Sequence, residues 1–230
     1  MSRHLTHLTL ATMCCLAASA AAVEPGHFDV RLSVGISPGL GELTTSGSET
    51  NGTPTPSNDE TRILSGDSGL TVEPGVFYTH MLKDNWGIVA GGSFFYRTAG
   101  ANFFDSTALV SENIWLDAYG IDLAVGPIWQ RDGWRLELMP FIGFGTCSAQ
   151  ISSGTLNGTG SATSDKTSYV DYGIRAAGSY TFARHYMVGA QLGYMAFSTG
   201  EAKVTYTTLS EKDKLTGSGL LAAVTVGYAF

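Results

Sequence analysis

Few side chains in this 230-residue chain could carry out nucleophilic catalysis. An activated serine needs a histidine base within hydrogen-bond reach, and beyond residue 22 the histidines are His27, His80 and His185. None of them begins a His-x-Ser run, and the long polar segments of the chain contain no histidine. We therefore expect no catalytic residue and no enzymatic activity.

Metal and cofactor sites are not expected either. Cys147 and three scattered histidines lack the ligand spacing of a zinc site. The acidic residues of segment 38–67 could bind a divalent cation loosely, although a solvated acidic loop is the favoured interpretation; these are Glu42, Glu49, Asp59, Glu60 and Asp67. Since Cys147 is the only cysteine after residue 22, no intramolecular disulfide is possible there.

Nine other charged residues share a spacing that suits ion pairing, because they fall on one face of segments with alternating polarity. They are Asp29, Arg31, Glu73, Arg97, Asp122, Arg135, Glu137, Asp171 and Arg175. Unpaired buried charge is expensive, so the near balance of acids and bases predicts a mutually paired network. If these segments form a narrow barrel of eight strands, the network would lie inside it. A conduction or gating path is the alternative. A plug of side chains is favoured because eight strands enclose only enough space for side chains.

The elements that must position these charges are strands, because apolar residues recur with a period of two. In residues 28–37 every second residue is apolar, from Phe28 to Ile36, and no residue breaks the pattern. Pro74 lies on the apolar face of its segment and removes one donor from the ladder. The predicted strands are 28–37, 69–80, 86–98, 115–129, 134–146, 169–182, 186–197 and 220–230.

The connections between these strands alternate between long and short. Segments 38–67, 99–113, 147–168 and 198–218 are long and rich in Ser, Thr and Gly, so we expect mobile loops, with a hairpin extension near 203–209. The other connections are short turns, one of them with Asp132-Gly133. This organisation predicts an all-β fold, an eight-stranded antiparallel up-and-down transmembrane β-barrel.

Aromatic residues support a barrel in lipid over a soluble sandwich of two sheets. A sandwich would bury its rings between the sheets. Here rings of the outward-facing set flank the short turns and the chain ends, and a second group lies near the long segments, as expected of the two aromatic girdles of a membrane barrel. The predicted interface aromatics at the short-turn end are Phe28, Tyr78, Trp86, Trp129, Trp134, Phe182 and Tyr186.

The first 22 residues have the features of a secretory signal peptide. Arg3 provides the positive start, and residues 8–22 form an apolar stretch of small residues. A membrane anchor is the alternative, but the stretch is shorter than the roughly 20 residues of a spanning helix. We therefore expect a signal peptide over 1–22 and a barrel domain over 23–230. The formal net charge of −7 argues against nucleic acid as a partner.

With these features, residues 23–230 resemble the small outer-membrane β-barrels of the OmpA/OmpX type. The ending, with Val224, Val226, Tyr228 and Phe230 at every second position, resembles the signal that the barrel-assembly machinery reads. The resemblance therefore implies assembly contacts at these four residues. It also implies a monomer in the bacterial outer membrane, with outer-membrane lipids, including lipopolysaccharide, as partners.

Fold resemblance alone does not assign a function. Members of this class include structural anchors, adhesins, narrow channels and lipid-modifying enzymes. A general porin needs about 16 strands, which this chain cannot supply. We expect a structural or surface-interaction role, with an unidentified surface ligand for the loops. A narrow, porin-like channel for small solutes is the alternative. A lipid-modifying enzyme is disfavoured because the histidines lie at the short-turn end.

Overall fold

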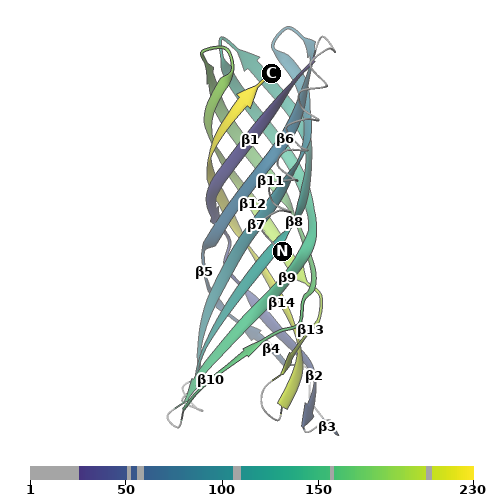
Figure 1. Cartoon of the computed structure of the whole chain (residues 1–230), viewed down its shortest axis with the longest axis vertical. Helices are drawn as coiled ribbons and strands as arrows, with labels where there is room; N and C mark the ends of the chain where they lie inside the picture. Colours follow the sequence, from purple (N-terminus) through teal and green to yellow (C-terminus); the bar gives the residue numbers. More distant parts are fainter. Residues whose placement is uncertain (1–25, 51–52, 56–59, 106–109, 156–157, 206–208) are drawn as a thin grey trace, which may run out of the picture.

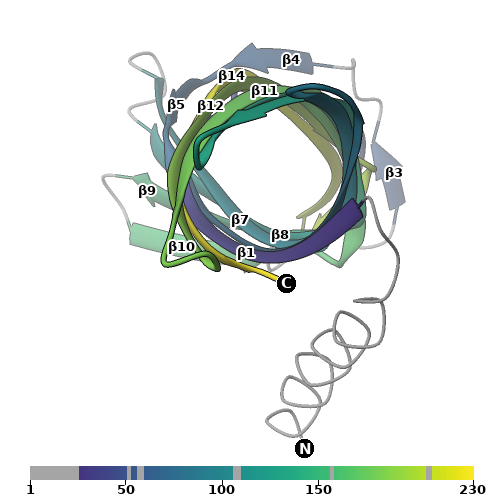
Figure 2. The same cartoon turned by 90° about the horizontal axis from the view of Figure 1, so that it is seen from above.

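The computed structural model describes residues 26–50, 53–55, 60–105, 110–155, 158–205 and 209–230. The predicted signal peptide, residues 1–22, lies outside this part of the chain. Within it, no helix is long and apolar enough to cross a membrane. The described residues form antiparallel strands, and eight of these strands close into a ring (Figures 1 and 2). The predicted fold class is confirmed.

The eight ring strands follow one another around the barrel in chain order. They are β1 (Gly26–Ser37), β6 (Gly69–Lys83), β7 (Trp86–Asp105), β8 (Val110–Arg131), β9 (Trp134–Thr155), β11 (Thr167–Phe182), β12 (Tyr186–Thr199) and β14 (Leu209–Ala229). The ring closes where β1 pairs with β14, from Asp29 opposite Ala229 to Ile36 opposite Ala222.

Short turns join the ring strands at one end of the barrel. In the β8–β9 turn, Asp132 and Gly133 have φ values of 51° and 84°, the left-handed conformation that a two-residue type I′ hairpin requires. The Asp-Gly pair in the sequence predicted this turn correctly. Both chain ends of the ring, the start of β1 and the end of β14, lie at this short-turn end (Figure 1).

The ring turns its polar residues inward and its apolar residues outward. On β1, Asp29, Arg31 and Ser33 are buried, whereas Leu32 and Ile36 are exposed. A soluble protein would bury these apolar side chains. An apolar outer wall of this kind suits a barrel that is surrounded by lipid.

The prediction of long mobile loops is wrong over most of their length, whereas the hairpin expected near 203–209 is confirmed, because residues 202–205 pair with 210–213. Strands β7, β8, β9 and β14 continue well past the predicted strand ends. Segment 38–67 contains β2 (Glu42–Thr50), β3 (Thr53–Thr55), β4 (Glu60–Ile63) and β5 (Ser65–Asp67), and the later segments contain β10 (Gly158–Thr163) and β13 (Ala202–Thr205). We call this part of the molecule, beyond the ends of β1, β6, β11 and β12, the outer tier.

The extra strands of the outer tier take the places of ring strands that have ended. Where β1 ends, β2 takes its place as the partner of β14. Strand β4 pairs with β2, and β5 pairs with β7. On the other side, β10 pairs with β9 and β13 pairs with β14, and a single bridge between Ser164 and Val204 joins the two. The outer tier is therefore a continuation of the barrel wall (Figure 1).

The outer tier has an apolar core, which explains why the predicted loops are ordered. On β8, Ile114 and Leu116 point inward and are buried, whereas Ile121 and Leu123, nearer the short turns, point outward. The apolar face therefore switches sides along one strand, as expected where the surroundings change from lipid to water. The buried apolar residues of the outer tier include Leu40, Leu43, Leu64, Ala101, Ile114, Leu116, Ala149, Ile151, Ala162, Val204 and Leu215.

Three prolines coincide with interruptions in the ring's pairing. Pro74 pairs with β1 opposite Leu32, but the β6–β7 ladder skips it. Pro127 and Pro140 keep their pairing with β7 and β11, while the β8–β9 ladder skips residues 125–127 and 138–140. Because proline has no backbone N–H, each of these residues removes a donor on the side where pairing is lost.

Candidate functional site: the barrel interior

The barrel interior contains two clusters of charged side chains. The short-turn-end cluster consists of Asp29, Arg31, Arg135 and Glu137, from β1 and β9. Arg31 binds both carboxylates, and its Nη1 lies 2.6 Å from Glu137 Oε2. Arg135 donates to Asp29 at 3.0 Å and to Glu137 at 2.9 Å. Two guanidinium groups and two carboxylates therefore pair with each other in this cluster, while the buried Nε of Arg135 has no hydrogen-bond partner.

The central cluster lies farther from the short turns and joins four strands. It consists of Glu73 on β6, Arg97 on β7, Asp122 on β8, and Asp171 and Arg175 on β11. Arg97 donates to all three carboxylates, including Glu73 Oε1 at 2.6 Å. Arg175 Nη1 donates to Glu73 Oε2 at 2.9 Å. All nine charged residues expected in the interior are buried there in one or other cluster.

Aromatic rings fill the space around these guanidinium groups. Arg31 lies over the ring of Phe77, 4.3 Å from its centroid, and Arg97 lies 4.4 Å from the centroid of Phe95. Arg175 is 5.2 Å from the centroid of Phe141. Such cation–π contacts contribute more when the partners are desolvated, so the rings both fill the lumen and stabilise the buried charges.

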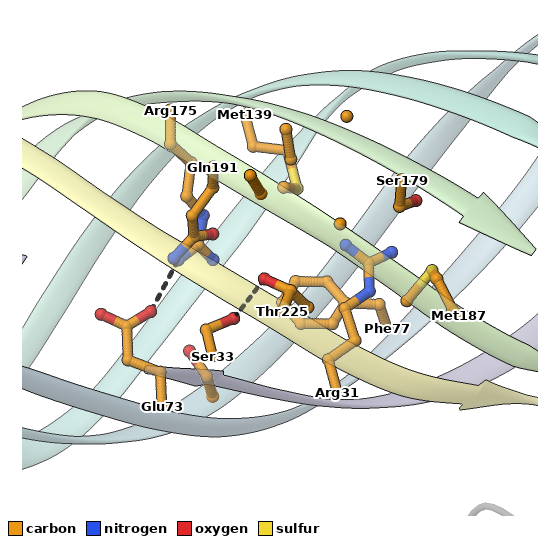
Figure 3. A pocket seen from close by; sticks show the side chains of 15 residues that line it. Arg31, Ser33, Glu73, Phe77, Met139, Arg175, Ser179, Met187, Gln191 and Thr225 are labelled. Atoms are coloured by element: carbon orange, nitrogen blue, oxygen red, sulfur yellow. Dashed lines mark hydrogen bonds and ion pairs between the residues drawn. The ribbon is translucent and has the colours of Figure 1, made fainter. Parts of the chain in front are cut away.

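A cavity of about 20 Å³ lies between the two clusters. Figure 3 shows Glu73, Ser33 and Thr225 on one side of it, with Arg175 and Gln191 facing them. Ser33 and Thr225 are hydrogen-bonded to each other at 2.9 Å. This volume holds about one water molecule, and the cavity has no room for a solute.

A layer of rings separates the central cluster from the outer tier. Tyr169 packs against Phe95 and Phe197, with both centroid distances 5.6 Å. Beside it, a second cavity of about 10 Å³ is lined by Met195, Leu116 and other residues of this region. Sequence reasoning did not identify Tyr169 and Phe197 as interior residues, although their inward positions follow from the alternation along β11 and β12. Together with the charged clusters, this layer closes the lumen.

The predicted interface aromatics lie on the outer surface near the short turns. Phe28, Tyr78 and Trp129 are half-buried, and Trp86, Trp134, Phe182 and Tyr186 are exposed. Neighbouring rings contact each other, as in the pair Phe28–Tyr78 with a centroid distance of 4.8 Å. They form a belt around one end of the barrel, as expected of a girdle at a membrane interface.

The predicted assembly residues occupy the outer face of the closing strand. Val224, Val226, Tyr228 and Phe230 are all exposed, and the rings of Tyr228 and Phe230 lie 5.0 Å apart. The backbone N–H of Phe230 donates to the carbonyl of Phe28 at 2.9 Å. These contacts tie the end of the chain to β1. The recognition of these residues during assembly stays a prediction.

The described residues contain no group of three or more His, Cys, Asp or Glu side chains that could hold a metal ion. His27 lies 3.4 Å from Arg135 Nη1, and His185 Nδ1 lies 2.8 Å from the carbonyl of Ala229. The side chain of Cys147 is buried on the inner face of the barrel wall, and this burial raises the pKa of its thiol to about 12. A protonated thiol is a poor nucleophile and metal ligand.

Several solved structures of bacterial outer-membrane proteins are similar to this chain at low sequence identity. A major outer membrane protein from Thermus thermophilus is 12% identical, with a TM-score of 0.43, and the match covers 90% of this chain and 100% of that one. OprG from Pseudomonas aeruginosa is 15% identical, with a TM-score of 0.41 and coverage of 89% and 96%. Ail from Yersinia pestis, the attachment invasion locus protein, is 12% identical, with a TM-score of 0.26 and coverage of 88% and 99%.

A family assignment comes from the sequence itself. No curated protein matches the chain significantly. The model of the outer membrane protein beta-barrel domain matches residues 7–230, nearly the whole sequence. This chain therefore belongs to the outer membrane protein beta-barrel domain family, and the closed eight-stranded ring is the barrel of an outer-membrane protein.

Proposed function

We propose that this protein is a closed, non-catalytic outer-membrane barrel that presents a rigid surface outside the cell. The short turns lie in the periplasm, and the outer tier rises above the outer leaflet. Its role is structural or one of surface interaction. The observation that carries this proposal is the filled lumen: two charged clusters and a ring layer occupy it, and the cavities beside them measure about 20 and 10 Å³.

The filled lumen argues against the alternative of a narrow channel. A permeating solute would have to displace Arg97, which binds three carboxylates, and also the packed rings of Phe95, Tyr169 and Phe197. Breaking one buried ion pair typically costs about 3–5 kcal/mol. Conduction would therefore need a rearrangement of the whole interior rather than the movement of one side chain.

The positions of the histidines argue against a lipid-modifying enzyme. A general base must lie within hydrogen-bond reach of the hydroxyl that it activates. His27, His80 and His185 all lie at the short-turn end, away from the outer leaflet in the proposed orientation. A surface role instead rests on the outer tier, because residues on a rigid scaffold can hold a binding surface in place.

Planar-bilayer recording of the purified protein tests the proposal. We expect no resolvable single-channel events. The matched control combines Arg97→Gly, Phe95→Gly and Tyr169→Gly, which removes three ion pairs and the ring layer's contacts across the lumen and should make the folded barrel leak. Discrete conductance steps in the wild-type protein would reject the closed barrel in favour of the channel. Cleavage of the outer tier by protease added to intact cells, with the short turns protected, tests the orientation.

A further inference from the structure

The central cluster does not balance in charge. It contains three carboxylates, Glu73, Asp122 and Asp171, but only two guanidinium groups, Arg97 and Arg175. The short-turn-end cluster has two of each. With every group ionised, the centre of the barrel would carry one negative charge without compensation, which is expensive in a buried site.

The excess charge can be traced to two oxygen atoms. Glu73 uses both of its carboxylate oxygens, since Oε1 accepts from Arg97 and Thr71 and Oε2 accepts from Arg175. Asp122 and Asp171 each accept from Arg97 through Oδ2. The Oδ1 atom of each aspartate is buried and has no hydrogen-bond partner. Both side chains are completely buried, so bulk water does not reach these two oxygens.

These two oxygen atoms meet above Gly143. Asp122 on β8 and Asp171 on β11 are the direct neighbours of Gly143 on either side. A Cβ atom on Gly143 would collide with Oδ1 of both aspartates. Both oxygens therefore occupy the space that a side chain at position 143 would need, and the absence of that side chain brings the two carboxyl groups together.

We propose that Asp122 and Asp171 hold a single proton between their Oδ1 atoms. One carboxyl group donates and the other accepts, which gives an O–H···O⁻ hydrogen bond, a short and strong type. Two carboxylates that share a site characteristically retain one proton in this way. The proton satisfies both unpartnered oxygens at once. It also leaves the central cluster with two negative and two positive charges.

No other group of the described interior can provide this compensation. The charged groups around the pair are Glu73 from β6, Arg97 from β7 and Arg175 from β11, all already in the cluster. Arg135 and Glu137 from β9 and Asp29 and Arg31 from β1 pair with each other in the short-turn-end cluster. The buried inward residues of β12 and β14 nearest this level are uncharged: Gln191, Met195, Leu221 and Thr225. Tyr169 on β11 faces Arg97 and both aspartates from the ring layer, but a neutral phenol brings no positive charge.

The shared proton makes stability depend on pH in a specific way. In the unfolded chain an aspartate is ionised above about pH 5, whereas the native pair keeps its proton. Unfolding therefore releases one proton, and the unfolding equilibrium constant rises about tenfold for each pH unit as long as the native pair stays protonated. The barrel is thus stabilised at lower pH by this pair.

Urea unfolding of the barrel in lipid vesicles at about pH 5.5 and about pH 7.5 tests the proposal. In Asp171→Asn the amide can donate to Asp122 without a titrating proton. As long as the native pair keeps its proton, the unfolding constant of the wild type should rise about tenfold more per pH unit than that of Asp171→Asn. The control Asp67→Asn changes an exposed carboxylate and should keep the wild-type pH dependence. Equal pH dependence in the wild type and Asp171→Asn would overturn the proposal.

A second measurement covers the case in which Asp171→Asn does not fold. Asp122→Asn removes the same proton from the other side and should show the same loss of pH dependence. Infrared difference spectra of the wild type at neutral pH should contain the carbonyl stretch of one protonated carboxylic acid, which Asp122→Asn lacks. A wild type without that band would overturn the proposal. A stability that follows the sodium concentration at fixed ionic strength, and not pH, would also overturn it, because a cation would then balance the charge.

Discussion

Leu64→Ala should loosen the outer tier without disturbing the ring within the membrane. Leu64 lies between β4 and β5, where it is 6% exposed, and its backbone N–H donates to the carbonyl of Gly41 at 2.9 Å. Its neighbour Ile63 points the other way and is 86% exposed. The two adjacent positions therefore allow the same kind of truncation to be made inside and outside the wall.

The expected magnitude follows from burial. Truncation of a buried leucine to alanine costs about 2–5 kcal/mol, whereas a change at an exposed site usually stays within about 0.5 kcal/mol. Because the outer tier packs around its own core, the cost should appear as easier local opening. An opening free energy lowered by 2–5 kcal/mol corresponds to exchange about 30-fold to several thousandfold faster.

Amide hydrogen exchange followed by mass spectrometry measures this opening in lipid vesicles. The informative amides are those of Gly41 and Leu64, which donate to Thr216 and Gly41. In Leu64→Ala their exchange should accelerate, while amides of β1 near the short turns keep the wild-type rate. Ile63→Ala is the control and should resemble the wild type. Unchanged exchange in Leu64→Ala would mean that the outer tier has no cooperative core, which would refute the reasoning.

Three further predictions concern single side chains. Cys147 has a thiol pKa of about 12, so it should not react with a maleimide at about pH 8 in the folded barrel but should react after unfolding. Labelling of the folded form would show that the site opens. Arg135→Met leaves Asp29 and Glu137 short of a partner and should lower the free energy of unfolding by about 3–5 kcal/mol in urea titrations. The double variant with Glu137→Met should recover much of this loss, because Arg31 and Asp29 still balance; no recovery would mean that Arg135 acts through packing alone. Phe230→Ala should slow insertion by purified barrel-assembly machinery but not spontaneous folding into vesicles, and equal slowing in both would mean that the ring stabilises the barrel and is not a recognition element.

Alternation of polarity was enough to predict the ring and its interior. From Phe28 to Ser37 each residue faces the side that its parity indicates, because a strand in a membrane wall has lipid on one side and packed polar groups on the other. The nine interior charges followed from the same rule. What the rule could not give was the partner of each charge. Whether Arg97 binds Asp122 or Glu137 depends on the register between strands far apart in sequence.

The strands of the outer tier were not predicted, because the composition of these segments suggests loops. The odd or even position of their apolar residues in the alternating pattern is the more informative signal. Segments rich in Ser, Thr and Gly suggest mobile loops, yet Ile114, Leu116 and Ala118 alternate as regularly as Ile121 and Leu123. Their parity is opposite, because the apolar face turns inward once water replaces lipid outside. A change of phase within one alternating segment is therefore a sequence signal for the height at which a barrel leaves the membrane.

The pairing of β1 with β14 joins the first and last strands of the barrel. During synthesis and export, the residues that complete the cylinder are the last to emerge, so a partly delivered chain presents two unsatisfied edges. Those edges invite pairing with other chains, and long-range pairing forms slowly because loop closure comes first. A truncation that removes β14 should therefore yield aggregates rather than a smaller cylinder.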